Sequence, residues 1–215
     1  MSTFSRLALS LLVMLSVTGC SAFGLFGDDD STAQKKAFDT FQSEAELDIL
    51  WSTSVGDGLG NKYHQFAPAV IGESVFALAA EGVVEALNKG DGQTIWQTDV
   101  AEVITSGVGA GFGQVFVASE SGKLYALSAT SGEQVWVKQL STEVVAPPQV
   151  NSEIVVIQQI NGQVVALDRK TGEQRWVYDT VIPRLTLRGT STPIVTEAVT
   201  LASFANGKLA VIRND

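Results

Sequence analysis

Short apolar runs, separated by turn residues, recur along most of this chain. In residues 123–128 the run is typical, because Leu124, Tyr125, Ala126 and Leu127 are consecutive and place apolar side chains on both alternating faces of an extended segment. A strand with this pattern is buried on both sides. The pattern therefore predicts strands that lie between two neighbouring sheets, and it does not suit a sheet with one face in water.

The runs group into units of four predicted strands. In the second unit we expect strands at residues 103–109, 114–118, 123–128 and 134–139, with turn signals between them. The glycine-rich stretch at residues 107–113 lacks the spacing of a phosphate-binding loop, and no helix follows it. It is therefore interpreted as a turn between two strands.

A tryptophan returns every 40 residues, at Trp96, Trp136 and Trp176. Each closes the same phrase, which opens with a glycine 14 residues earlier and continues through Ala-Leu to a second glycine. A repeat of this length with short β-rich segments is typical of propeller blades or solenoid coils. We predict an all-β fold, a β-propeller of four-stranded antiparallel blades. In it, each tryptophan lies on the outermost strand of its blade and packs against the next blade.

The ends of the repeat leave the number of blades open. Trp51 has no complete phrase before it, so it is interpreted as part of a lone outer strand. The fourth unit reaches its third strand near residues 207–212 and has no tryptophan strand after it. These strands could close a four-bladed ring, or they could form about four blades of a larger ring, because propellers have about 4 to 8 blades.

The N-terminal residues have the layout of a secretory signal peptide. Arg6 supplies a positive charge, and residues 7–17 form an apolar stretch too short to span a bilayer. Residues 17–20 (Val-Thr-Gly-Cys) resemble a bacterial lipobox, and Cys20 is the only cysteine of the chain. The alternative is an ordinary signal peptide with an incidental cysteine.

The lipobox resemblance implies cleavage before Cys20 and acylation of that cysteine, for example with palmitate. Two or more acyl chains would anchor the protein stably, whereas one chain binds only marginally. Ser21 after the cysteine, instead of Asp, implies the outer membrane. We therefore expect a signal peptide at residues 1–19, a lipidated cysteine and flexible tether at 20–45, and a partial propeller at 46–215.

Composition and charge argue against several classes of function. The chain is 45% hydrophobic and 17% charged, which is sufficient for a buried core. Its net charge of −9 argues against a nucleic-acid partner, which requires a positive patch. His64 is the only histidine, so neither a histidine-rich metal site nor a hydrolase triad can be assembled.

The tryptophan phrase is similar to the docking repeat of quinoprotein-type propellers. In the same order, residues 51–63, the three repeats and the Leu185-Thr-Leu-Arg-Gly189 segment resemble the BamB family, lipoproteins of the outer-membrane β-barrel assembly (BAM) machinery. This resemblance implies an eight-bladed propeller of which the chain is an N-terminal part. It also implies a non-catalytic scaffold, without a cofactor, on the periplasmic face of the outer membrane. Its expected partners are BamA, the rest of the BAM complex and nascent outer-membrane proteins.

The connection between the third and fourth units is the candidate binding segment. It is five residues longer than its counterpart in the preceding unit, and Leu185 and Leu187 alternate with Thr186 and so point the same way. The residues alone allow either a lengthened strand with both leucines in the core or an exposed binding loop. The family resemblance implies that Leu185, Leu187 and Arg188 contact BamA, together with acidic residues of a later blade that these 215 residues do not include.

Two other functions remain open from the sequence. True quinone-dependent (PQQ-type) dehydrogenases share the docking repeat, but by family pattern they need adjacent cysteines or a calcium site. A generic envelope lipoprotein that binds a sugar or peptide is the second alternative. The docking tryptophans Trp51, Trp96, Trp136 and Trp176 are expected to have a structural role under every one of these functions.

Overall fold

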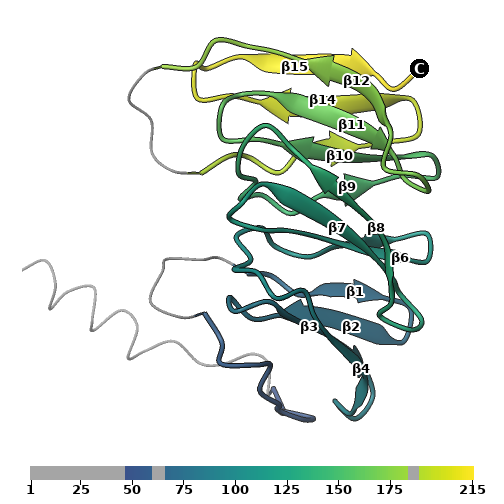
Figure 1. The fold of residues 1–215 in the computed structure, drawn as a ribbon. Coiled ribbons are helices and arrows are strands. Elements are labelled where there is room, and N and C mark those ends of the chain that lie inside the picture. Colours follow the sequence, from purple (N-terminus) through teal and green to yellow (C-terminus); the bar gives the residue numbers. More distant parts are fainter. Residues whose placement is uncertain (1–46, 60–65, 184–188) are drawn as a thin grey trace, which may run out of the picture. The chain divides into compact units, whose positions relative to one another are not determined.

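The computed structural model describes residues 47–59, 66–183 and 189–215. Residues 49–215 form one compact unit, which contains every described strand (Figure 1). The regular secondary structure of the described residues is entirely β, as the sequence pattern predicts. The division of residues 1–45 into signal and tether falls on residues outside the described part and stays a prediction.

Four antiparallel sheets follow one another along the chain, and each is built from consecutive strands. The strands of the first two sheets are β1 (Ala69–Ile71), β2 (Ser74–Leu78), β3 (Val83–Asn88), β4 (Thr94–Asp99), β5 (Gly109–Gly111), β6 (Gln114–Ala118), β7 (Lys123–Ser128) and β8 (Gln134–Gln139). Those of the third and fourth sheets are β9 (Gln149–Val150), β10 (Ile154–Gln158), β11 (Val164–Asp168), β12 (Gln174–Tyr178), β13 (Ile194–Val195), β14 (Val199–Ser203) and β15 (Leu209–Arg213).

The short first strands of the sheets lie next to one another. β1 contacts β5, β5 contacts β9, and β9 contacts β13, so these strands form the shared inner side of the unit. The tryptophan strands β4, β8 and β12 lie at the opposite edge of their sheets, as Figure 1 shows. This is the arrangement of propeller blades around a common axis. It confirms the predicted fold class.

The core consists of three apolar layers, each between two successive sheets. The middle layer joins Phe116 and Leu124 of the second sheet to Val155 and Leu167 of the third, and all four side chains are essentially inaccessible to solvent. The central strands are buried on both faces, because alternate residues point into the layer on either side. Both-sided burial is what the uninterrupted apolar runs predict.

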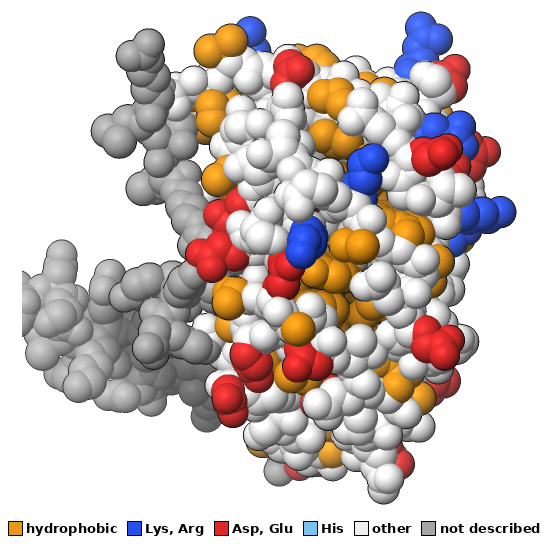
Figure 2. All heavy atoms as spheres, viewed as in Figure 1, with side chains coloured by type: hydrophobic (Ala, Val, Ile, Leu, Met, Phe, Trp, Pro, Cys, Tyr) orange, Lys and Arg blue, Asp and Glu red, His pale blue; other side chains and the backbone are white. Residues whose placement is uncertain are grey.

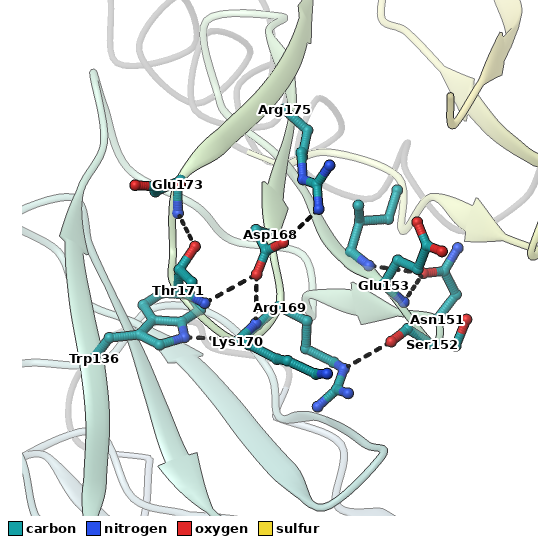
Figure 3. A network of polar contacts seen from close by, with 11 residues as sticks. Trp136, Asn151, Ser152, Glu153, Asp168, Arg169, Lys170, Thr171, Glu173 and Arg175 are labelled. Atoms are coloured by element: carbon teal, nitrogen blue, oxygen red, sulfur yellow. Dashed lines mark hydrogen bonds and ion pairs between the residues drawn. The ribbon is translucent and has the colours of Figure 1, made fainter.

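The first and second sheets are each also attached to the next sheet by a hydrogen bond from an indole ring. Trp96 Nε1 donates a hydrogen bond to the Ala129 carbonyl at 2.9 Å, and Trp136 Nε1 donates to the Arg169 carbonyl at 2.9 Å. In Figure 3 the Trp136 ring lies against the turn that follows β11, and within this turn Asp168 accepts hydrogen bonds from the backbone N–H groups of Lys170 and Thr171. Trp96 and Trp136 thus each reach a backbone carbonyl of the next sheet, a contact that a docking role would require.

Two predicted strands are wrong in detail. Residues 103–109 do not form a strand; β5 is only Gly109–Gly111, and the residues before it form a connection that makes one isolated bridge, at Ile104. No strand forms around Trp51 either. Its indole nevertheless docks on the first sheet as the other rings dock, because Trp51 Nε1 donates to the Lys89 carbonyl at 2.8 Å.

The fourth sheet has three strands, as the sequence predicts, and one of its faces is uncovered. Leu209 and Val211 of β15 are 66% and 64% exposed. The matching positions of β7, Leu124 and Ala126, are fully buried against the next sheet. In the described part of the chain, buried Trp176 Nε1 also lacks a hydrogen-bond partner. In the earlier repeats, the following repeat covers the face that carries Leu209 and Val211 here, and it supplies the carbonyl to which the equivalent indole donates.

Candidate partner-docking site

The site is built around the connection between β12 and β13. Leu185, Leu187 and Arg188, the predicted partner-binding residues, lie outside the described residues, as does His64. The two stems of the connection, residues 179–183 and 189–193, are described. They lie at the end of the sheets that also carries the β10–β11 and β14–β15 hairpins, so these hairpins determine how the connection leaves and re-enters the fold.

The first stem is held by both hairpins. Asn206, in the β14–β15 hairpin, donates through Nδ2 to Thr180 Oγ1 at 3.1 Å and to the Val181 carbonyl at 2.7 Å. Gly162, in the β10–β11 hairpin, packs so closely that a Cβ there would lie 2.6 Å from Ile182 Cγ2. The backbone is therefore fixed up to Ile182, while the Val181 side chain is 88% exposed.

The second stem is held by one carbonyl of β14. Ser191 Oγ donates to the Ser203 carbonyl at 2.8 Å, and Gln158 Nε2 donates to the same oxygen at 2.8 Å. Gln158 is a buried amide, so both of its ends need partners in the protein. Its Oε1 lies 3.4 Å from Ser191 Oγ, which also bonds to it. This polar cluster fixes the chain as it enters the fourth sheet.

A cavity of about 210 Å³ lies between the two stems. Its apolar wall includes Ile160, Ile182 and Phe204, and its polar residues include Gln158, Ser191 and Ser203. A lining of this kind suits a group that is mainly apolar and carries a few polar atoms, because the polar side chains of the wall can form hydrogen bonds with those atoms. The sequence did not predict this cavity.

The corresponding connection between the first and second sheets carries a charged cluster. Glu102 pairs with Lys123 and accepts a hydrogen bond from Ser121 Oγ at 2.6 Å. The hydrogen bond from Lys123 and those from Ser119 and Ser121 lower the pKa of Glu102 from 4.5 to about 2. At the next connection, Ser141 Oγ lies within hydrogen-bond distance of the neutral side chains of Gln159 and Gln163. The polar groups at these connections thus differ from repeat to repeat.

Charge is unevenly distributed over the described residues. Between Leu47 and Gly107, Lys89 is the only described basic residue, whereas acidic residues are frequent. Figure 2 shows Lys and Arg side chains on the half of the visible face that carries the third and fourth sheets, mixed with acidic ones. No continuous basic surface is visible on that face.

The described residues contain neither a candidate metal site nor a candidate membrane-spanning helix. No three His, Cys, Asp or Glu side chains are grouped there as a metal site would require. No described helix is long and apolar enough to cross a membrane.

Comparison with known proteins gives one consistent family. The sequence model of the family described as "Outer membrane protein assembly factor BamB" matches residues 80–215. The BamB of Pseudomonas aeruginosa is 40% identical over 202 residues, which cover 94% of this chain and 52% of that protein. The BamB of Escherichia coli strain K12 is 34% identical over 209 residues, covering 93% and 53%. The chain therefore spans about half the length of the curated relatives that it matches.

Solved structures agree with the sequence comparison. The crystal structure of BamB from Moraxella catarrhalis matches with a TM-score of 0.69 at 26% identity, covering 77% of this chain and 48% of that one. A europium-containing methanol dehydrogenase matches with a TM-score of 0.52 at 22% identity, covering 60% of this chain and 26% of that one. The second likeness concerns the fold alone.

Proposed function

Because the chain belongs to the BamB family of outer membrane protein assembly factors, we propose that it is a non-catalytic scaffold subunit of the BAM complex. In this role it binds BamA and assists the insertion of nascent outer-membrane proteins. A lipid on Cys20 would hold it to the periplasmic face of the outer membrane. The names of the relatives and the BamB crystal structure support membership of the assembly machinery. Those names do not mention BamA or a lipid anchor, so both are part of the proposal.

The observation that carries the proposal is the way the fold holds the lengthened connection. Asn206 fixes one stem, and the Gln158–Ser191 cluster fixes the other. A loop with fixed stems loses less conformational entropy on binding than a loop that must be ordered first. The fold therefore provides a firm base from which Leu185, Leu187 and Arg188 can contact a partner.

The test is capture of the purified periplasmic domain of BamA by the full chain. We expect Leu187→Ala combined with Arg188→Ala to weaken binding by at least about tenfold, because truncation of an apolar anchor or an arginine at an interface often costs more than about 1 kcal/mol each. The thermal unfolding midpoint should not change. Unchanged capture would move the interface elsewhere on the molecule.

A matched control is available on the outer strand β8. Val135→Ala with Lys138→Ala also removes one exposed aliphatic and one basic side chain, and it does so away from the connection. This variant should bind BamA as the unaltered chain does. Equal weakening by both double variants would indicate a general effect of lost surface charge and apolar area, and it would count against the connection as the docking site.

A further inference from the structure

One position in each sheet contacts the segment that leads into that sheet. It lies in the hairpin between the second and third strands, directly before a glycine, and it is occupied by Glu81, Ser121, Asn161 and Asn206. These side chains bond, in the same order, to the Asp57 N–H, Glu102, Ser141 and the Val181 carbonyl. At the fourth sheet, this repeated contact holds the first stem of the candidate docking site.

The contact at Asn206 depends on the amide of its side chain. Asn206 Nδ2 donates to Thr180 Oγ1 at 3.1 Å and to the Val181 carbonyl at 2.7 Å. Glu81 fills the same repeat position with a carboxylate, and it does so by accepting a hydrogen bond from the Asp57 N–H at 2.5 Å. Neither a carbonyl nor a carboxylate oxygen can donate, so a carboxylate at position 206 would lose the Val181 contact and repel that oxygen. Loss of the amide would therefore release the stem.

The residue after Asn206 is Gly207, and this dipeptide offers a chemical route by which the amide is lost. The Gly207 nitrogen gives up its proton and attacks Asn206 Cγ, which closes a succinimide ring. The bond between Cγ and Nδ2 breaks, and Nδ2 takes up a proton and leaves as ammonia. Water then opens the ring at either carbonyl and leaves aspartate or isoaspartate. A glycine favours the attack because it has no side chain to obstruct a close approach of the backbone.

The chain has a second Asn-Gly dipeptide at the same repeat position, and the surroundings of the two glycines differ. Gly162, after Asn161, is buried, and a Cβ there would lie 2.6 Å from a side-chain carbon of the first stem. Gly207 is exposed, and no heavy atom lies within 4 Å of the place of a Cβ. Its N–H donates to the Phe204 carbonyl at 3.0 Å, so the hairpin must open locally before the nitrogen can react. The folded protein leaves room for the ring at Asn206 and not at Asn161.

We propose that Asn206 is a deamidation site, and that its conversion to aspartate or isoaspartate releases the first stem of the docking connection. The amide is a hydrogen-bond donor to that stem, and the glycine after it is open to solvent. The effect on partner binding rests on the proposed function, because a stem that is no longer held must be ordered again on docking. Since ammonia is lost, the change accumulates with the age of the protein.

The first test follows the side-chain amides by peptide mass spectrometry of the full chain, kept in mildly alkaline buffer with and without urea. In the folded sample we expect aspartate and isoaspartate at Asn206, while Asn161 keeps its amide. In the urea-unfolded sample both should convert, because the packing around Gly162 is then lost. An intact Asn206 amide in the folded sample, at a time when the unfolded sample has converted, would overturn the inference. Equal conversion of both asparagines in the folded sample would also contradict it.

The second test makes the product directly. Asn206→Asp removes the donor, and Asn161→Asp is its matched control, because it makes the same change of charge where Ser141 Oγ can donate to the new carboxylate. In hydrogen–deuterium exchange, Asn206→Asp should exchange at least about fivefold faster at Val181 and Ile182, the factor that corresponds to the loss of one hydrogen bond. Asn161→Asp should match the unaltered chain. Equal exchange in all three proteins would show that the amide does not hold the stem.

Capture of the purified periplasmic domain of BamA separates this inference from the proposed function. If the unaltered chain binds BamA, Asn206→Asp should bind at least about fivefold more weakly, and Asn161→Asp should bind as the unaltered chain does. Equal binding by Asn206→Asp would overturn the link between the stem and docking, while the proposed function stands. If the unaltered chain does not bind BamA, the proposed function fails, and mass spectrometry and hydrogen exchange still decide whether deamidation of Asn206 releases the stem.

Discussion

Three tryptophan rings meet the sheets of this protein at three equivalent glycines. A Cβ at Gly92, Gly132 or Gly172 would lie within 3 Å of the ring of Trp51, Trp96 or Trp136, respectively. Any larger residue would push the ring away and open the layer between two sheets. The 40-residue spacing predicts that Trp96 and Trp136 pack against the next sheet, but it does not predict which residue they meet there. Trp51, also expected to dock, reaches the equivalent glycine from outside the 40-residue repeat.

The sequence could not reveal the Glu102–Lys123 pair. The two residues are 21 positions apart, and the pair does not recur in the next repeat, where Thr142 and Gln163 stand at the matching places. Only the fold brings the connection onto the β6–β7 hairpin, where the carboxylate meets Lys123, Ser119 and Ser121. The strong lowering of the Glu102 pKa is therefore a product of tertiary structure, and it leads to a prediction about acid stability.

The free energy of unfolding should fall as the pH drops from about 4.5 to 2, partly because of Glu102. Its pKa is about 2 in the folded protein and near 4.5 when unfolded, so in this window the unfolded chain binds more protons. The contribution is complete above the unfolded pKa and is lost as the pH falls through the folded one. Urea titrations across this range should show a shallower dependence for Glu102→Gln than for the unaltered chain.

The control for this experiment is Glu133→Gln, which removes a carboxylate from an exposed turn between β7 and β8. It should leave most of the acid-side slope in place. If Glu102→Gln and the unaltered chain lose stability with the same slope, the carboxylate is not held by Lys123 in solution.

At the scale of the strand, the sequence was accurate where side chains alternate between two buried faces. The predicted strands at residues 114–118, 123–128 and 134–139 coincide with β6, β7 and β8. The prediction failed at residues 103–109, because buried connection residues such as Ile104 are as apolar as strand residues. Pattern alone does not separate these two kinds of burial. The cavity between the two stems was missed for a related reason, since the connections lack the recurring phrase that aligns the strands.

Equivalent leucines on β7 and β15 should differ widely in their contribution to stability. Leu124 is fully buried between two sheets, so Leu124→Ala should cost about 2–5 kcal/mol. Leu209 holds the same repeat position on the uncovered face of the fourth sheet and is 66% exposed, so Leu209→Ala should cost less than about 1 kcal/mol. Chemical denaturation of the two variants measures the difference. Similar losses would mean that another surface covers the face of β15 in solution.

At the scale of the whole molecule, counting repeats located both the four sheets and the place of the insertion. The count could not decide how many blades complete the ring, because each repeat contacts only its neighbours and carries no information about closure. The structure has the same local character. Each of the three core layers joins two successive sheets. The exposed Leu209 and Val211 lie on the face of the fourth sheet that no further described sheet covers.

We expect the location of the molecule in the cell to depend on Cys20, which lies outside the described residues. If Cys20 is acylated, Cys20→Ser should prevent processing of the signal peptide. The uncleaved protein should then be absent from the outer-membrane fraction, because stable anchoring needs the acyl chains attached to this cysteine. Ser21→Ala keeps the cysteine and should fractionate as the unaltered chain does. Fractionation of the envelope, with mass spectrometry of the N-terminal peptide, measures both variants. Normal outer-membrane recovery of Cys20→Ser would show that contacts of the folded protein, and not a lipid, hold it at the membrane.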